Sequence, residues 1–235
     1  MKKTETPAGR SCAAWKDITA ALEKWREALR AEKSAPGDPS VTTVAERYSR
    51  SPWAVLVSTI LSLRTKDEVT LAASRRLLEK APGPRELLKL TEEETARLAY
   101  PAGFYRTKAA NLHKIASLLI EKYGGSVPAE MDALLALPGV GRKTANLVLV
   151  EAFDLPGLCV DIHVHRISNR AGWVTTSSPD ETEGVLRNIL PQKYWKNINP
   201  LLVLYGQNVC RPVSPFCSRC VITGHCLRRG VDKSR

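Results

Sequence analysis

The sequence has 235 residues, and lysine plus arginine outnumber aspartate plus glutamate by 35 to 24, giving a formal net charge of +11. This charge favours a polyanionic partner, usually double-stranded DNA or RNA. An anionic membrane surface is less favoured, because the positive charge is not collected on one amphipathic helix. No apolar run reaches the length that a bilayer requires, so we expect no membrane partner.

The chain opens with a polar segment and one helix. Residues Met1–Thr6 lack the apolar core of a secretion signal, so we expect a cytoplasmic protein. Apolar residues spaced by three and four predict an amphipathic helix from Trp15 to Leu29. A cluster of proline, glycine and polar residues at 34–39 then predicts a linker.

Later helices are marked by their caps and their apolar stripes. Ser51 and Pro52 predict the start of a helix that is apolar nearly all round up to Leu63, so we expect it to be buried. No segment alternates with period two for long enough to form a strand, so the expected fold class is all-α with about ten helices. The other expected helices are 67–80, one starting at the capping box Thr91–Glu94, 106–123, 131–137, one from the turn after Leu137 to Phe153, 161–172, one starting at Ser178, and 198–209.

The stretch from Leu137 to Ala145 reads Leu-Pro-Gly-Val-Gly-Arg-Lys-Thr-Ala and joins two of these helices. Gly139 and Gly141 can take positive φ without a Cβ clash, so glycine makes such a turn at little cost. Arg142 and Lys143 follow in the first turn of the next helix, where backbone N–H groups point outward. Such a turn is typical of a phosphate site, and the alternative is a plain linker with a solvated Arg-Lys pair.

Asp161 follows Lys143 after one helix and a loop that contains Pro156 and Gly157, so the chain can return Asp161 to the mouth of the glycine turn. A lysine is a nucleophile only when its amine is neutral, and the positive end of its own helix disfavours the ammonium form. An ionised aspartate nearby could activate that amine and stabilise positive charge on a sugar ring. The alternative is that Lys143 contacts a phosphate and Asp161 is only an N-cap.

Four cysteines with the spacing C-x6-C-x2-C-x5-C predict a metal site near the C-terminus: Cys210, Cys217, Cys220 and Cys226. Disulfides are not expected in a reducing compartment. Zinc sites usually contain two tight C-x2-C pairs, and here only one pair is tight. The wider gaps suit a larger object such as an iron–sulfur cluster. Cys12 and Cys159 lie outside the spacing and are expected to be buried or incidental thiols.

Three motifs therefore occur in one order: the glycine turn with Lys143, the segment Val160–Arg166 that contains Asp161, and the four-cysteine loop. Together they resemble endonuclease III, the bifunctional DNA glycosylase branch of the helix-hairpin-helix superfamily. The resemblance covers nearly the whole chain from Ser51 to Cys226. Related adenine glycosylases typically lack the lysine, which argues against that branch.

The resemblance implies a helix-hairpin-helix DNA glycosylase fold with two all-α domains. Residues 45–155 are expected to form a six-helix barrel with the hairpin, and residues 11–44 and 156–235 an iron–sulfur cluster domain, with the active site between them. The four cysteines would be the ligands of a [4Fe–4S] cluster. The implied partner is damaged double-stranded DNA, bound by a monomer that associates with the nucleoid.

The reaction that the resemblance implies is removal of an oxidised pyrimidine, of the thymine-glycol type, followed by strand cleavage. The damaged base is flipped out of the duplex, because the anomeric carbon is out of reach inside the stack. Lys143 matches the nucleophile that displaces the base and forms a Schiff base, and Asp161 matches the family's invariant acid. β-Elimination then cuts the strand on the 3′ side. The residues that match the hairpin gripping the DNA backbone are Gly139, Val140, Gly141 and Arg142.

Two positions depart from the family. The family usually has glutamine where this chain has Arg64, and commonly leucine where it has Phe104, and both places contact DNA around the flipped base. Arginine could donate to an orphaned guanine or to phosphate, and phenylalanine could wedge between bases. A mismatch or other-lesion glycosylase is therefore one alternative. A DNA-binding protein that carries the cluster without catalysis is the other.

Overall fold

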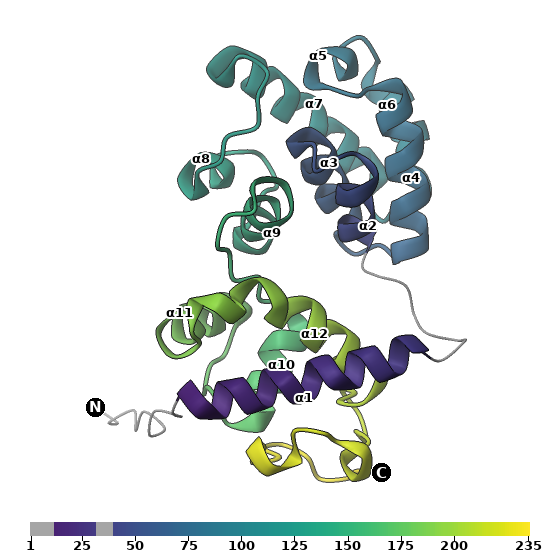
Figure 1. Ribbon diagram of the computed structural model, residues 1–235. Coiled ribbons are helices and arrows are strands. Elements are labelled where there is room, and N and C mark those ends of the chain that lie inside the picture. Colours follow the sequence, from purple (N-terminus) through teal and green to yellow (C-terminus); the bar gives the residue numbers. More distant parts are fainter. Residues whose placement is uncertain (1–11, 32–39) are drawn as a thin grey trace. The chain divides into compact units, whose positions relative to one another are not determined.

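The computed structural model describes residues 12–31 and 40–235. Within these residues the secondary structure consists of helices joined by turns and loops, with no strand (Figure 1). The all-α fold class is therefore confirmed. By its backbone contacts the chain divides into two units. Unit 1 comprises Met1–Pro36 and Leu158–Arg235, and unit 2 comprises Gly37–Gly157. The expectations for the N-terminal signal and the 34–39 linker lie outside the described residues.

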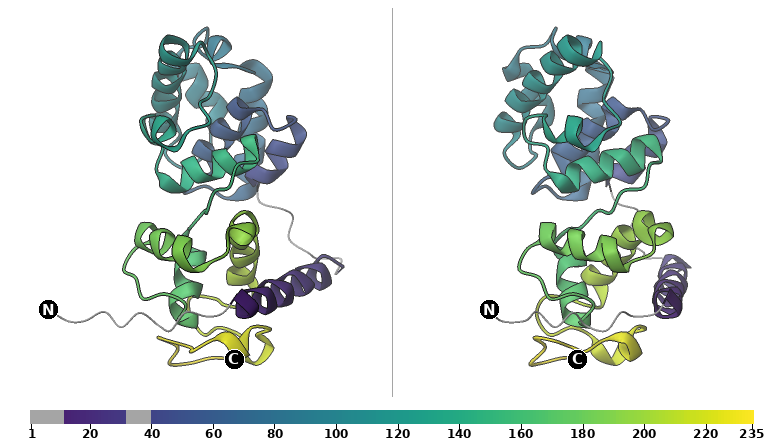
Figure 2. Two further views of the ribbon diagram at one scale, coloured as in Figure 1. Left: turned by 60° about the vertical axis from the view of Figure 1, so that its left-hand side comes forward. Right: turned by 90° about the vertical axis from the view of Figure 1, so that its left-hand side faces the viewer.

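Unit 2 is built around one buried helix, α3. This helix packs against α2, α4, α7 and α9, and Figure 2 shows its neighbours from two further sides. Every residue from Trp53 to Leu61 is buried, as the apolar run predicted, and the Ser51 side chain accepts from the Ala54 N–H (3.4 Å) at its N-cap. The helices of unit 2 are α2 (Ser40–Arg47), α3 (Pro52–Ser62), α4 (Asp67–Lys80), α5 (Pro84–Leu87), α6 (Glu92–Ala99), α7 (Tyr105–Tyr123), α8 (Met131–Leu135) and α9 (Arg142–Phe153).

Capping residues fix several of these ends. Thr91 and Glu94 form both bonds of the predicted capping box, with the Glu94 N–H donating to Thr91 Oγ1 (3.1 Å) and the Thr91 N–H donating to Glu94 Oε2 (2.7 Å). Gly124 ends α7 in the left-handed conformation, with φ of 63°, and its N–H donates to the Leu119 carbonyl. Local sequence therefore sets where these helices begin and end.

Two helices were not expected, α2 and α5. Both are short, and tertiary packing stabilises them: α2 lies against α3 and α4, and α5 lies against α7. The packing of α2 puts its residues in unit 2, so the boundary between the units lies after Pro36 and not between residues 44 and 45. The second boundary follows Gly157, where residue 155 was expected.

Unit 1 combines the first helix with the C-terminal part of the chain. Its helices are α1 (Cys12–Ala31), α10 (Ile162–Ala171), α11 (Pro179–Ile189) and α12 (Trp195–Asn208), with the short 3-10 turns η1 (Gln192–Tyr194), η2 (Cys217–Arg219) and η3 (Thr223–His225). Helix α12 packs against α1 and α10 (Figures 1 and 2). Trp15 from α1 meets Trp173 edge-on, with ring centroids 5.0 Å apart. Within the described residues, no helix is long and apolar enough to cross a membrane.

Candidate functional site

The glycine turn joins α8 to α9 in unit 2. Gly139 has φ of +76°, and a Cβ there would lie 2.7 Å from Asn111 Nδ2, so glycine is required. Gly141, in contrast, has φ of −96° and acts as the N-cap of α9 in extended backbone. Val140 is only 7% exposed, and its N–H donates to the Leu137 carbonyl (3.1 Å), so its side chain belongs to the core.

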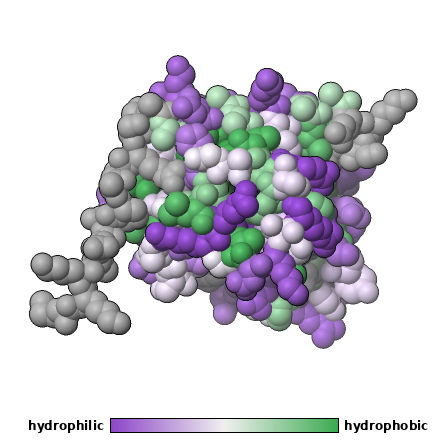
Figure 3. Space-filling view, turned by 90° about the horizontal axis from the view of Figure 1, so that it is seen from below, coloured by the Kyte–Doolittle hydropathy of each residue, from purple (hydrophilic) through white to green (hydrophobic). Residues whose placement is uncertain are grey.

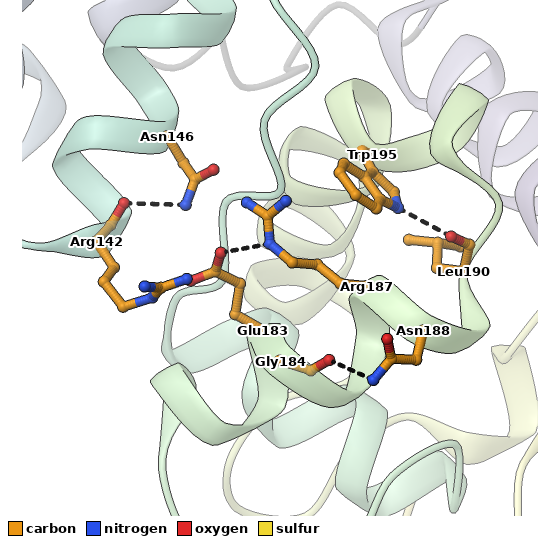
Figure 4. A network of polar contacts seen from close by, with 8 residues as sticks. All are labelled: Arg142, Asn146, Glu183, Gly184, Arg187, Asn188, Leu190 and Trp195. Atoms are coloured by element: carbon orange, nitrogen blue, oxygen red, sulfur yellow. Dashed lines mark hydrogen bonds and ion pairs between the residues drawn. The ribbon is translucent and has the colours of Figure 1, made fainter. Parts of the chain in front are cut away.

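Arg142 and Lys143 occupy the first turn of α9, as predicted. This first turn contains no acidic residue, and Gly141 supplies no side-chain cap, so the positive end of the helix is not offset locally. Lys143 is exposed. Asn146 Nδ2 donates to the Arg142 carbonyl (3.0 Å) within the same helix, which Figure 4 shows from close by. The turn therefore presents two cations on a rigid helix end.

Asp161 lies in unit 1, at the N-cap of α10. Its Oδ1 accepts from the backbone N–H groups of His163 and Val164, both at 2.9 Å. These two bonds fix the carboxylate at the N-terminal end of the helix. Asp161 is half-buried. Lys143 belongs to unit 2.

Arg64 and Phe104 come from two different turns of unit 2 and meet at the surface. Arg64 follows α3 and Phe104 precedes α7. The guanidinium carbon of Arg64 lies 5.5 Å from the centroid of the Phe104 ring, within the range of a cation–π contact. Phe104 is 62% exposed, and Arg64 is exposed too. Sequence reasoning had identified both positions separately, and the structure brings them together.

Lys108 stands beneath this pair and was missed by the sequence analysis. It is only 6% exposed, and burial lowers its pKa to about 8. The available signal was its place in α7, where it precedes the buried residues Leu112, Ile115 and Leu119 on one helical stripe. A charged residue on an apolar stripe needs buried polar partners, and sequence alone does not name them.

The cysteine loop surrounds one cavity in unit 1. All four predicted ligands line it: Cys210, Cys217, Cys220 and Cys226. Cys210 follows the end of α12, and the other three lie in or beside η2 and η3. Apolar side chains of Val209, Phe216 and Val231 also line the cavity. Among the described residues, no three His, Cys, Asp or Glu side chains meet tightly enough to hold a single metal ion.

Arg170, from α10, anchors the first part of this loop. Its Nη1 donates to Cys210 Sγ (3.3 Å) and to the Arg211 carbonyl (2.8 Å), and its Nη2 donates to the Pro212 carbonyl (3.0 Å). Burial raises the pKa of the Cys210 thiol, while the hydrogen bond and the charge of Arg170 oppose that shift. Burial also raises the pKa of the Cys226 thiol.

The surface around the loop is basic. Three guanidinium carbons lie 4.5–5.2 Å from the Phe216 ring centroid, those of Arg211, Arg219 and Arg235. Figure 3 shows a face of the molecule on which strongly hydrophilic residues surround scattered hydrophobic ones. Elsewhere in unit 1, Glu183 pairs with Arg187 (2.8 Å) along α11 (Figure 4).

Comparison with known families gives the class of protein. Residues 57–192, more than half of the chain, match the model of the HhH-GPD superfamily of base excision DNA repair proteins. The match includes both the glycine turn and Asp161. The chain is therefore a DNA glycosylase of base excision repair.

Individual relatives narrow the class to one family. The endonuclease III of Thermotoga maritima is 46% identical over 200 residues, covering 82% of this chain and 94% of that protein. A solved non-covalent endonuclease III–DNA complex superposes with a TM-score of 0.74 at 31% identity, covering 91% of this chain and 95% of the other. A trapped endonuclease III–DNA covalent intermediate superposes with a TM-score of 0.75 at 31% identity, covering 91% of this chain and 96% of the other. The chain belongs to the endonuclease III family.

Proposed function

We propose that this protein is a bifunctional DNA glycosylase and AP lyase that removes oxidised pyrimidines, of the thymine-glycol type, from duplex DNA. The observation that carries the proposal is Lys143, exposed on the first turn of α9 directly behind the glycine turn. The trapped intermediate of a relative with 31% identity supports a covalent mechanism. The proposed partner is damaged double-stranded DNA, bound by a monomer.

In the proposed reaction, Lys143 Nζ attacks the anomeric carbon of the flipped nucleotide and the damaged base leaves with the bonding electrons. One amine proton goes to the departing base and the other to the ring oxygen as the sugar opens, which leaves a Schiff base between Nζ and the anomeric carbon. β-Elimination then removes a proton from C2′ and breaks the bond to the 3′ phosphate, which leaves with the bonding electrons. Asp161, held in place by two backbone N–H groups, would stabilise positive charge on the sugar.

The glycine turn would hold the DNA backbone during these steps. A phosphate would sit at the start of α9, beside Gly139, Gly141 and Arg142, where the helix end is positive and has no side-chain cap. The buried Val140, whose N–H donates to the Leu137 carbonyl, holds the shape of the turn. Unit 2 would then be the barrel domain with its hairpin, and unit 1 the cluster domain.

We also propose that the four cysteines hold a [4Fe–4S] cluster. Four soft sulfur donors around one apolar cavity fit such a cluster, in which each iron takes one thiolate. The cluster would supply structural cross-linking of the basic loop. The residues that hold it would be Cys210, Cys217, Cys220 and Cys226.

Borohydride trapping tests the reaction. Wild-type protein, incubated with a thymine-glycol duplex and borohydride, is expected to form a covalent adduct, because the reductant fixes the Schiff base. Lys143→Ala should form none. The control Lys122→Ala removes an exposed lysine from α7 and should trap as wild type does. Absence of an adduct from wild type, or equal trapping by Lys143→Ala, would refute the proposal.

A second candidate function is favoured by the contact between Arg64 and Phe104. An arginine and an aromatic ring at the positions next to the flipped base could shift the preference towards another lesion or a mismatch. Repeating the trapping with a panel of lesions and opposite bases separates the two functions. A preference for a mismatch over thymine glycol would favour the second.

A further inference from the structure

The ammonium group of Lys108 ties down the end of α3. Its Nζ donates to the carbonyl oxygens of Leu61 (2.8 Å) and Leu63 (2.6 Å) and to Thr65 Oγ1 (2.9 Å). A lysine ammonium has three donors, and all three are used here. The last carbonyls of a helix lack partners within the helix. Lys108 therefore closes α3 and fixes the turn that carries Arg64.

A second link joins this turn to the turn that carries Phe104. The Gly103 N–H donates to Thr65 Oγ1 (3.0 Å), the same oxygen that accepts from Lys108. A Cβ at Gly103 would lie 2.5 Å from the Arg64 carbonyl oxygen, so the two backbones touch. Only glycine permits this approach. Thr65 is thus the shared junction of the two turns.

Both exposed side chains stand on backbone that L-residues rarely adopt. Arg64 has φ of +52° and Phe104 has φ of +57°. A non-glycine residue in this region is unfavourable, and it persists only where the surroundings determine its backbone. Here the surroundings are Lys108, Thr65 and Gly103. The network therefore determines the directions in which Arg64 and Phe104 leave the surface.

We propose that Lys108 is a positioning residue that presents Arg64 and Phe104 to the DNA as one rigid pair, an inference that rests on the proposed function. Two side chains ordered before binding lose less conformational freedom on the DNA than two independent ones. The pair would support the duplex while the damaged base is extruded. Lys108 itself touches neither the sugar nor the base.

This role predicts unequal effects on two substrates. Excision of a base requires extrusion of a stacked and paired nucleotide, which costs the free energy of unstacking and unpairing. A preformed abasic site has no base to extrude, so its cleavage depends less on the pair. Loosening the pair should therefore slow base excision more than cleavage at an abasic site. A general loss of folding would lower both rates equally.

The variant Lys108→Met keeps the apolar length of the side chain and removes its three donors. In single-turnover assays we expect base excision from a thymine-glycol duplex to fall about tenfold or more, since small misplacements have effects of this size. Cleavage of a preformed abasic site should fall by less than about threefold. Lys114→Met, at an exposed position of the same helix, is the matched control and should match wild type on both substrates.

Two further variants separate positioning from stability. Thr65→Val removes the shared oxygen at nearly constant volume and should show the same unequal pattern. In a Phe104→Ala background, Lys108→Met should cost much less than alone, because coupled residues are not additive. Equal losses on both substrates, unchanged excision, or full additivity with Phe104→Ala would each overturn the inference. If wild type itself forms no adduct with borohydride, the proposed function fails instead.

Discussion

The two units keep their loops in place by different means. In unit 2, helices α2–α9 share a continuous apolar core, and the turns that carry Arg64 and Phe104 rest on it through one buried lysine. In unit 1, the chain after Val209 has almost no core of its own. Of residues 210–235, only Pro215 and Ile222 are buried.

Polar anchors replace the missing core in this C-terminal segment. Arg170 donates to two of its carbonyls, Trp173 Nε1 donates to the His225 carbonyl (3.2 Å), and the Val221 N–H donates to the Tyr205 hydroxyl (2.9 Å). Each net hydrogen bond contributes only about 1 kcal/mol. Unit 2 should therefore stay folded after the loss of any one of its hydrogen bonds, whereas the C-terminal segment depends on the cross-link that the proposed cluster would supply.

Removal of the proposed cluster is the strongest test of this contrast. Cys220→Ala is expected to abolish the visible iron–sulfur absorbance, because thiolate–metal bonds contribute on the order of 10 kcal/mol to the folding of small metal-bound segments. Limited proteolysis should then cut within residues 210–235 while unit 2 stays intact. Iron analysis of the wild type provides the independent measurement.

The control for this variant is Cys159→Ala, at a buried cysteine outside the loop. It should keep both the colour and the iron. A colourless wild-type protein with one bound zinc would contradict the cluster, and equal proteolysis of both units in Cys220→Ala would contradict the contrast between them.

The sequence predicted those parts of the fold that depend on local chemistry. The bounds of α4 follow the expected 67–80, and the caps at Ser51, Thr91 and Ser178 are formed as expected, because capping depends on residues three or four apart. The short helix α2 packs against α3 and α4, and the N–H of its first residue, Ser40, donates to Asp67 Oδ1 (3.1 Å), so it depends on partners that are distant in the sequence.

The site residues that the sequence predicted are likewise those whose signal is local. The cysteine spacing and the glycine turn were visible because each lies within one short stretch. Lys108 and Arg170 were not, because their partners lie about forty residues away along the chain. Of the two glycines in the turn, Gly139 takes the positive φ that glycine permits and Gly141 does not, since a glycine in the sequence indicates conformational freedom but not how it is used.

Loss of Arg170 is expected to have the second largest effect. Arg170→Met would remove the donor of the Arg211 and Pro212 carbonyls, and each lost hydrogen bond costs about 1 kcal/mol. We expect a lower melting temperature, with loss of visible absorbance before loss of helical signal. Arg75→Met breaks an exposed pair with Glu79 and should leave the melting temperature nearly unchanged, because solvent screens such a pair. Equal melting of the two variants would contradict the role of Arg170.

The smallest expected effect is a pH dependence that originates in unit 2. Burial lowers the pKa of Lys108 to about 8 from its ordinary value of 10.5, so between these values the unfolded chain binds a proton that the folded protein has released. Stability must therefore rise with pH in this window. The gain is about 1 kcal/mol from pH 8 to pH 9, or roughly 2–4 °C in melting temperature for a protein of this size.

Lys108→Met lacks this gain, so the melting temperature of wild type relative to the variant should rise from pH 8 to pH 9 and stay constant below pH 7. Other titrating groups are shared and cancel in the difference, and Lys114→Met should show no such rise. Over the same pH range the neutral amine keeps only two N–H donors for its three acceptors. The protein thus gains stability with rising pH while Lys108 holds the turn that carries Arg64 with fewer hydrogen bonds. A fall in base excision that accompanies this rise in stability would distinguish positioning by Lys108 from a purely structural role.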